Sequence, residues 1–193
     1  MTGTAEKLIA ETARLIVNRG YNGFSYADLA DRFGIRKASI HHHFPSKADL
    51  VVAVVERGRA GIQAQIALLD DDAATAMDRL LAYTGYWERC ILNQTSPFCL
   101  AGVLAAELPA LPEEIGTVVR GHFDDLRRWV EGVLTRGAAE GSMTLEERPA
   151  VEAEIFVAAV YGAMLAARAF DDPTRFSVVV EAAIRRIKAF PRH

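Results

Sequence analysis

The chain has 193 residues, 51% of them hydrophobic, and a formal net charge of −3 at pH 7. This length suits one large domain or two small ones with a buried core. Its two cysteines are too few for a secreted disulfide framework, and no charged and apolar leader is recognisable, so we expect a cytoplasmic protein. The longest apolar run, Ile155 to Ala167, is shorter than the roughly 18 to 20 residues of a membrane span, and we expect no membrane partner.

Charge is distributed unevenly along the chain. Residues 1–60 carry nine Lys and Arg against six Asp and Glu, a net charge of +3, which leaves −6 for the remainder. A basic first part on an acidic body is typical of a protein whose first part alone contacts phosphate. The charge pattern therefore favours a nucleic-acid contact near the N-terminus.

Helical periodicity and capping residues divide the chain into about nine helices, and no segment has the pattern of a strand. We therefore predict an all-α fold. Asp70-Asp71-Asp72 is expected to form a solvated turn after the fourth helix. The expected helices cover about residues 4–19, 26–33, 36–43, 47–69, 73–93, 98–108, 113–140, 146–170 and 173–190.

The second and third helices are the most informative part of the chain. Ser25 is a good N-cap with Asp28 three residues later, and Gly34 ends the second helix. Pro45 limits the third helix to about two turns, so that helix must be stabilised by packing. Two helices that meet at a glycine turn form the layout of a DNA-reading helix-turn-helix.

The third helix should place Ile40 and Phe44 inward and its polar side chains outward. Hydroxyl, imidazole and ammonium groups on that outward face can reach base edges or phosphates. At the starts of neighbouring helices, exposed N–H groups also favour phosphate, although simple capping competes with this role. A merely polar surface helix is the alternative. The residues expected to contact DNA are Ser25, Tyr26, Arg36, Lys37, Ser39, His41, His42 and Lys47.

The three consecutive histidines His41, His42 and His43 do not have metal-ligand spacing. Neighbouring side chains on a helix point about 100° apart, whereas two histidine ligands on one helix normally lie four residues apart. We expect neither a metal nor another cofactor.

The segment from Leu8 to about Val55 resembles the N-terminal domain of the TetR family of bacterial transcriptional regulators. The resemblance implies a helical DNA-binding head followed by a helical body that binds ligand and dimerises. Family members commonly have serine or threonine at the position of Arg36 and tyrosine at that of His41. The residues that carry the resemblance are Arg19-Gly20-Tyr21, Phe24-Ser25, Asp28-Leu29-Ala30, Gly34-Ile35, His42-His43-Phe44, Pro45-Ser46-Lys47 and Leu50.

A second segment, residues 96–102 followed by Leu104-Ala105-Ala106-Glu107-Leu108, resembles a subgroup of that family whose cysteine senses electrophiles. Here the cysteine is Cys99, and Phe98 replaces the usual glycine. A cysteine that begins a helix can have a more reactive thiolate. The alternative is a small buried hydrophobic residue without a chemical role.

The body should enclose an apolar effector site lined by aromatic side chains. Ordinary core packing is the alternative for each of these residues. The expected ligand-binding residues are Tyr83, Trp87, Phe98, Cys99, Phe123 and Leu126.

The last two helices should form a twofold four-helix bundle with a second copy of the chain. The first of them is apolar on nearly every side, and such a helix needs two partners, although the core of a single chain could supply both. The expected interface residues are Phe156, Val160, Met164, Val179, Ala183 and Ile187.

We therefore predict a DNA-binding domain over residues 1–48 and a ligand-binding and dimerisation domain over 49–193. The expected function is a homodimeric regulator, more specifically a repressor, which a small molecule or an electrophile releases from double-stranded, pseudo-palindromic operator DNA. The alternatives are a ligand-binding protein without DNA recognition and a helical enzyme. No catalytic motif in the sequence supports an enzyme.

Overall fold

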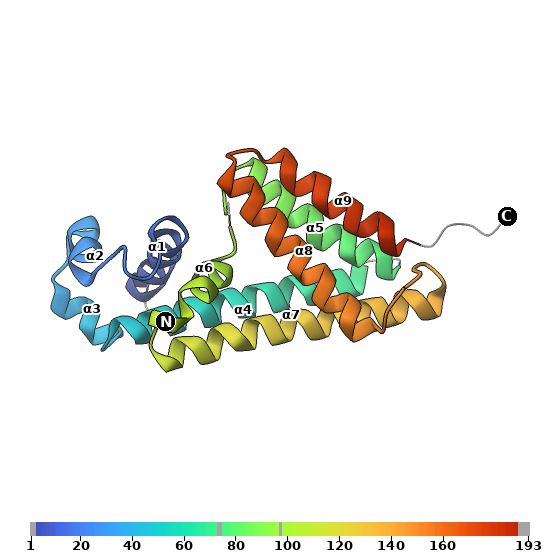
Figure 1. Ribbon diagram of the computed structural model, residues 1–193. Coiled ribbons are helices and arrows are strands. Elements are labelled where there is room, and N and C mark those ends of the chain that lie inside the picture. The colour runs from blue at the N-terminus through green and yellow to red at the C-terminus, as the bar shows by residue number, and fades with distance from the viewer. Residues whose placement is uncertain (1–2, 73–74, 97, 189–193) are drawn as a thin grey trace. The chain divides into compact units, whose positions relative to one another are not determined.

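The computed structural model describes residues 3–72, 75–96 and 98–188, and only the backbone of residues 69–72. Its regular elements within these ranges are nine α-helices and one short 3-10 helix, which confirms the predicted all-α fold (Figure 1). They are α1 (Gly3–Arg19), α2 (Tyr26–Phe33), α3 (Lys37–His43), α4 (Lys47–Asp72), α5 (Ala76–Leu92), α6 (Leu100–Glu107), η1 (Leu108–Ala110), α7 (Glu113–Glu140), α8 (Pro149–Ala169) and α9 (Thr174–Ile187).

The helices form two compact units that do not follow the order of the chain. The first unit contains the residues up to Ile62 together with Cys99–His122, and the second contains Gln63–Phe98 and the residues from Phe123 onward. The long helices α4 and α7 therefore each contribute to both units. The short helix α6 belongs to the unit of the DNA-reading helices, although residues 44–99 separate it from α3.

The first unit is built around a small apolar core. The side chains of Leu8, Leu29 and Ile40, from α1, α2 and α3, have no exposed surface, and Leu50 of α4 is equally buried. Each complete burial of such a side chain contributes about 1.5–3 kcal/mol. This packing stabilises α3, which at two turns is too short to persist alone.

The second unit contains α8 and α9, which lie side by side, and α5, which packs against α9. The start of α8 is fixed by Glu152, whose buried carboxylate accepts hydrogen bonds from the backbone N–H groups of Glu146 and Glu147 at 3.3 and 3.1 Å. The Arg186 guanidinium of α9 binds the same carboxylate. A buried carboxylate needs such a set of donors to offset its lost hydration.

Helix bounds differ from prediction at three places. Residues 70–72, expected to form a turn, belong to α4. The next helix begins at Ala76 because Thr75 and Asp78 form a capping box there. α8 begins at Pro149, in the favoured first position, rather than at residue 146. The expected helical residues 73, 74, 189 and 190 lie outside the described part of the chain.

The predicted dimer residues are mostly core residues. Within the single chain Phe156, Val160 and Met164 are already buried, and so is Ile187. At most 3% of each of these four side chains is exposed in the single chain, so little of their surface is available to a second copy. Val179 remains 38% exposed, and Ala183 is half-buried. The periodicity was correctly assigned to α8 and α9, but the sequence does not show which face of a wholly apolar helix is covered.

The opposite face of α8 is apolar and uncovered. Ile155 and Leu165 are exposed, and Ala158, Gly162 and Ala169 follow the same stripe at helical spacing. By length and composition α8 is apolar enough to cross a membrane, but 44% of the relevant window is buried within the chain. An apolar composition of this kind is expected for a helix that packs in the core on one side and has an uncovered apolar face on the other.

Candidate nucleic-acid interface and effector site

Local hydrogen bonds fix the start and end of α2. The Ser25 hydroxyl accepts from the N–H of Asp28 at 3.4 Å, and the Asp28 carboxylate accepts from the N–H of Ser25 at 2.7 Å. The Ser25 hydroxyl also donates to this carboxylate, which lowers the pKa of Asp28. At the other end Gly34 has a φ of +63°, a left-handed conformation that favours glycine. The turn between α2 and α3 is thus set by residues read correctly from the sequence.

The outward face of α3 has the composition that DNA contact requires. Lys37, Ser39, His41 and His42 are exposed, whereas Ile40 is completely buried. Arg36, at the N-cap of α3, is exposed as well. Four polar or basic side chains of α3, together with Arg36 at its N-cap, are therefore exposed, while the buried Ile40 holds the helix in place.

Tyr26 joins the start of α2 to the turn between α3 and α4. Its hydroxyl lies 2.9 and 2.6 Å from the carbonyl oxygens of Phe44 and Ser46, and donates to this pair. Burial, supported by the charge of Asp49, raises the pKa of Tyr26 to about 12, so the hydroxyl remains a donor at neutral pH. The His41 ring lies edge-on to the Tyr26 ring, with 4.8 Å between centroids.

Lys47 points into its own unit rather than away from it. Its ammonium donates to the carbonyl oxygen of Phe24 at 2.5 Å and lies 4.2 and 4.4 Å from the ring centroids of Phe24 and Tyr21. Burial lowers the pKa of Lys47, and the nearby carboxylates of Asp28 and Glu107 oppose that shift. The bond to Phe24 uses one N–H of the Lys47 ammonium, so a phosphate contact would have to be made by the other two.

Glu107, the last residue of α6, contacts the turn between α1 and α2. Its carboxylate accepts from the backbone N–H of Tyr21 at 2.8 Å. The neighbouring Gly20 has a φ of +73°, and a Cβ at this position would lie 2.1 Å from the Glu107 Oε1 atom. Glu107 belongs to the motif that follows Cys99, but the sequence does not indicate this contact, because no local pattern pairs residues so far apart.

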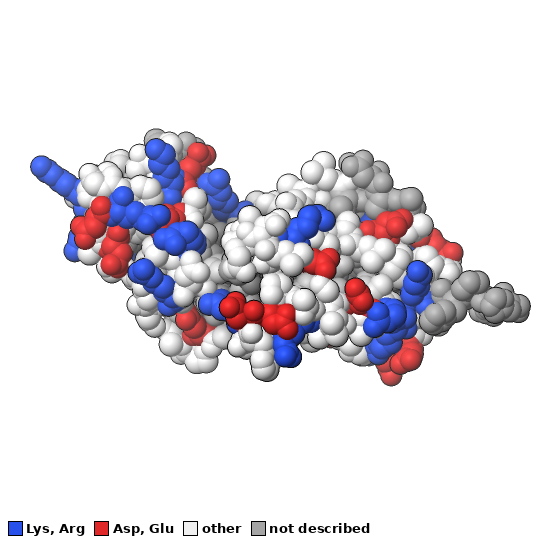
Figure 2. Space-filling model, turned by 90° about the horizontal axis from the view of Figure 1, so that it is seen from above, with Lys and Arg blue, Asp and Glu red and all other residues white. Residues whose placement is uncertain are grey.

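Charges of both signs surround the first three helices. Figure 2 shows Lys and Arg side chains gathered at the left-hand end, which carries α1, α2 and α3 in Figure 1, with Asp and Glu among them. Several of the acids are engaged locally; for example, Glu11 binds both Arg14 and Arg32, at 2.6 and 2.8 Å. The exposed Arg36 and Lys37 thus form the basic part of the α3 face.

Cys99 is a buried thiol at the N-cap of α6. Its Sγ atom lies 3.8 Å from Nε2 of His122 on α7, and each of these residues is only 4% exposed. Cys90, the other free cysteine, is also buried, and it belongs to the second unit. A thiol beside an imidazole has a base within reach of its proton, which a thiol surrounded only by apolar atoms lacks. The predicted sensor residue therefore has a chemical partner.

The other predicted ligand-binding residues belong to the second unit. Tyr83, Trp87, Phe98 and Leu126 are buried, and Phe123 is half-buried. Tyr83 and Phe123 each contact the ring of another aromatic residue. The ring centroids of Tyr83 and Trp129 are 5.4 Å apart, and those of Phe123 and Tyr161 are 5.0 Å apart. The Arg168 guanidinium lies over the Phe98 ring.

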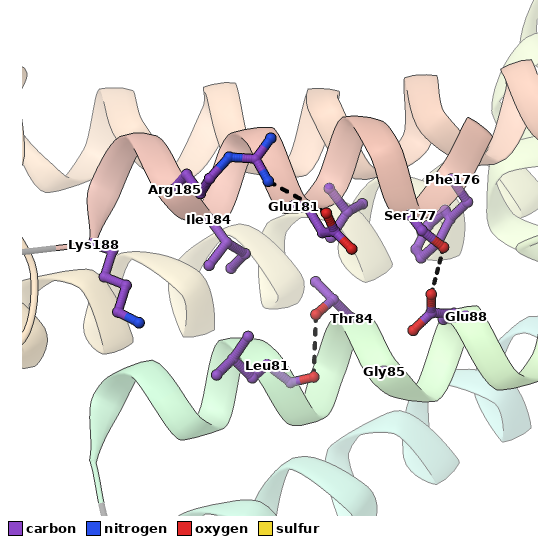
Figure 3. A pocket seen from close by; sticks show the side chains of 11 residues that line it. Leu81, Thr84, Gly85, Glu88, Phe176, Ser177, Glu181, Ile184, Arg185 and Lys188 are labelled. Atoms are coloured by element: carbon purple, nitrogen blue, oxygen red, sulfur yellow. Dashed lines mark hydrogen bonds and ion pairs between the residues drawn. The ribbon is translucent and has the colours of Figure 1, made fainter. Parts of the chain in front are cut away.

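A groove of about 370 Å³ lies between α5 and α9, and none of the predicted ligand residues lines it (Figure 3). Its apolar floor includes Phe176 and Ile184. At its rim Ser177 donates to Glu88, and Arg185 binds Glu181 at 3.3 Å. These four side chains are paired with one another, and Lys188 is the remaining charged side chain of the lining.

No group of three or more His, Cys, Asp or Glu residues that could hold a metal ion occurs in the part of the chain that the structure describes. The adjacent rings of His42 and His43 contact each other edge-on, with 5.5 Å between centroids.

Comparison with known proteins agrees with this geometry. Residues 8–54 match the family of bacterial regulatory proteins called the tetR family, and residues 76–183 match the tetracyclin repressor-like C-terminal domain. The HTH-type transcriptional repressor NemR of Escherichia coli K12 is 29% identical over 174 residues, which cover 86% of this chain and 84% of NemR.

Solved structures show the same relationship. A transcriptional regulator of the TetR family from Agrobacterium tumefaciens is 45% identical, with a TM-score of 0.94 over 96% of this chain and 98% of that one. The reduced form of Escherichia coli NemR is 26% identical, with a TM-score of 0.85 over 98% and 100% of the two chains. The chain belongs to the TetR family of bacterial regulatory proteins, in the subgroup that includes NemR, and is a DNA-binding transcriptional regulator with a ligand-binding C-terminal domain.

Proposed function

We propose that the chain is a homodimeric repressor that leaves its operator when a small molecule binds the body or an electrophile modifies Cys99. The exposed polar face of α3, anchored by the buried Ile40, is the observation that carries this proposal. Residues 1–48 bind the DNA, and residues 49–193 bind the effector and dimerise. NemR and DhaR, two relatives of this chain, are both described as repressors. A repressor of this kind acts in the cytoplasm.

In the DNA complex the α3 helices of the two protomers enter successive major grooves about 34–36 Å apart. Arg36 and Lys37 supply charge to the phosphates, and His42 reads base edges from the same face. Ser39 and His41 complete this contact set.

Ser25, Tyr26 and Lys47 lie at the edge of the same surface, but their polar atoms already hold the first unit together. Substitutions at these three positions therefore act on stability as well as on DNA affinity.

The dimer interface is formed by the uncovered faces of α8 and α9. Leu165 is 58% exposed on α8, and Val178 and Val179 are exposed on α9. Small residues such as Ala158 and Gly162 lie between the larger ones and allow close approach of a second copy. This face replaces the predicted residues that the single chain already buries. Pairing it would remove the largest apolar stripe of α8 from water.

α6 transmits the effector signal to the DNA-reading helices. Cys99 caps its first turn, and its last residue, Glu107, holds the N–H of Tyr21. In the electrophile response the Cys99 S–H proton moves to Nε2 of His122, the thiolate sulfur adds to one carbon of an activated C=C bond whose π bond breaks, and the protonated His122 delivers the proton to the neighbouring carbon. Added bulk at a buried N-cap displaces α6, and with it the turn between α1 and α2. Release requires that the effector favours the displaced state, because equal affinity for both states shifts nothing.

Substitution of Lys37 tests the DNA contact. Because Lys37 is exposed, Lys37→Ala should weaken binding to all duplexes by about threefold to tenfold and reduce the salt slope by about one, at an unchanged Tm. His42→Ala should instead change the preference among sequences. The measurement is a salt titration of affinity for a duplex selected in vitro with the purified protein. An unchanged salt slope for Lys37→Ala would remove Lys37 from the phosphate contacts.

Substitution of Leu165 tests the interface. Leu165→Glu places a charge in the proposed apolar contact and should convert the dimer to a monomer in sedimentation velocity, with a loss of operator affinity of at least about tenfold. Leu68→Glu is the matched control, since Leu68 is 64% exposed on α4, outside this face, and should leave the dimer intact. A dimeric Leu165→Glu protein would show that another face pairs the protomers.

Substitution of Glu107 tests the coupling through α6. Glu107→Ala leaves the Tyr21 N–H without its acceptor and should reduce the effect of N-ethylmaleimide on operator affinity to less than about one third of its native factor. Glu107→Gln, which can still accept the bond, should retain most of the effect. Glu114→Ala is the control for loss of a nearby exposed charge. An Ala variant with the full native response would exclude Glu107 from the coupling.

Substitution of each cysteine in turn shows which of the two senses the electrophile. N-ethylmaleimide should release operator DNA from the native protein and from Cys90→Ser, but should leave Cys99→Ser bound. Gel-shift titrations with matched modification times measure the effect. Equal release from the native protein and Cys99→Ser would contradict the sensor role.

A further inference from the structure

Two indole N–H groups in the second unit are buried without an acceptor. Among the described residues, the Nε1 atoms of Trp87 and Trp129 have no exposed surface and no hydrogen-bond partner. Trp87 as a whole is only 5% exposed. More than nine in ten buried polar groups in proteins are paired, and each unpaired one costs about 1–3 kcal/mol. Two such donors in one unit call for a specific explanation.

Both indoles are related to Tyr83, one along α5 and the other through a ring contact. Trp87 lies one helical turn after Tyr83 on α5, so the two side chains share a face of that helix. The Tyr83 ring in turn contacts the Trp129 ring of α7, with 5.4 Å between centroids. One indole thus shares a helix face with Tyr83 and the other contacts its ring, and Tyr83 and Trp87 are among the residues predicted to bind the effector.

We propose that Trp87 and Trp129 are the polar anchors of the effector site, and that the effector is a small apolar molecule with a neutral acceptor oxygen, as in a ketone, ester or amide. This inference rests on the proposed function, because it names the chemistry of the same ligand-binding body. An indole is a neutral donor that cannot accept a bond, so it selects an acceptor. A charged group would lose its hydration there without gaining an opposite charge from either indole.

The acceptor oxygen makes the affinity of the effector higher for one state of the body than for the other. A ligand oxygen that pairs with these N–H groups removes their desolvation cost, which an apolar ligand of equal shape leaves in place. The aromatic side chains must separate to admit the ligand, so binding repacks α5 against α7. Selectivity and conformational change thus originate from the same two side chains.

Matched ligand pairs with and without a carbonyl oxygen test the proposal on the full chain. We would measure the Kd values of acetophenone and ethylbenzene, and of benzophenone and diphenylmethane, by isothermal titration calorimetry. The native protein should bind at least one ketone about threefold to tenfold more tightly than its hydrocarbon partner. Equal binding within both pairs, or binding of none of the four, overturns the proposal.

Phenylalanine variants then show which indole is responsible for the tighter binding of the ketone. Trp87→Phe and Trp129→Phe keep an aromatic ring and lose the N–H, and at least one should reduce the ketone preference to less than twofold, with a Tm no lower than the native one. Thr12→Val is the control, because it removes another unpaired buried hydroxyl, in the first unit, and should keep the preference. A preference that survives in both Trp variants overturns the proposal. Failure of the native protein to bind any DNA would count against the proposed function and not against this site.

Discussion

The bond from the Tyr21 N–H to the Glu107 carboxylate is the contact on which the regulatory reading of this protein depends. It lies where three elements of the first unit meet: the turn after α1, the start of α4 and the end of α6. Gly20 is required there because a Cβ would overlap the carboxylate. The half-buried Lys47 ammonium adds a favourable charge near Glu107 and holds the carbonyl of Phe24. Movement of α6 therefore strains several hydrogen bonds at once.

This cluster also explains why the compact units differ from the functional domains. The proposed domain boundary between residues 48 and 49 follows the order of the chain, whereas packing assigns α6 and the first part of α7 to the unit of the DNA-reading helices. A helix that contains no DNA-contacting residue is thus built into the DNA-binding unit. That arrangement suits a regulator, because a signal that reaches α6 needs no further interface to reach α1.

The sequence indicates local features such as helix caps and turns, but it does not indicate packing between residues that are distant in the chain. Ser25, Gly34 and Pro45 mark the bounds of α2 and α3 because caps, left-handed turns and proline act within a few residues. The direction of Lys47 and the contact of Glu107 depend on residues distant in sequence, so no local pattern indicates them. For a related reason the sequence does not show that Phe156, Val160 and Met164 on α8 are buried within the single chain: an apolar helix has no polar face to show which side its own chain covers.

Helix α7 contains residues of both proposed routes, ligand binding and electrophile modification, by which the operator DNA is released. His122, beside Cys99, and Phe123, against Tyr161 of α8, are neighbours on α7 but belong to different compact units. Because α7 is continuous through this position, we expect repacking of its aromatic residues by a ligand to change the orientation of His122 as well. In the proposed electrophile response, modification of Cys99 acts on the same histidine. Two chemically different signals can therefore reach α6 through one histidine, and the direction of the response is set by which state of α7 each signal favours.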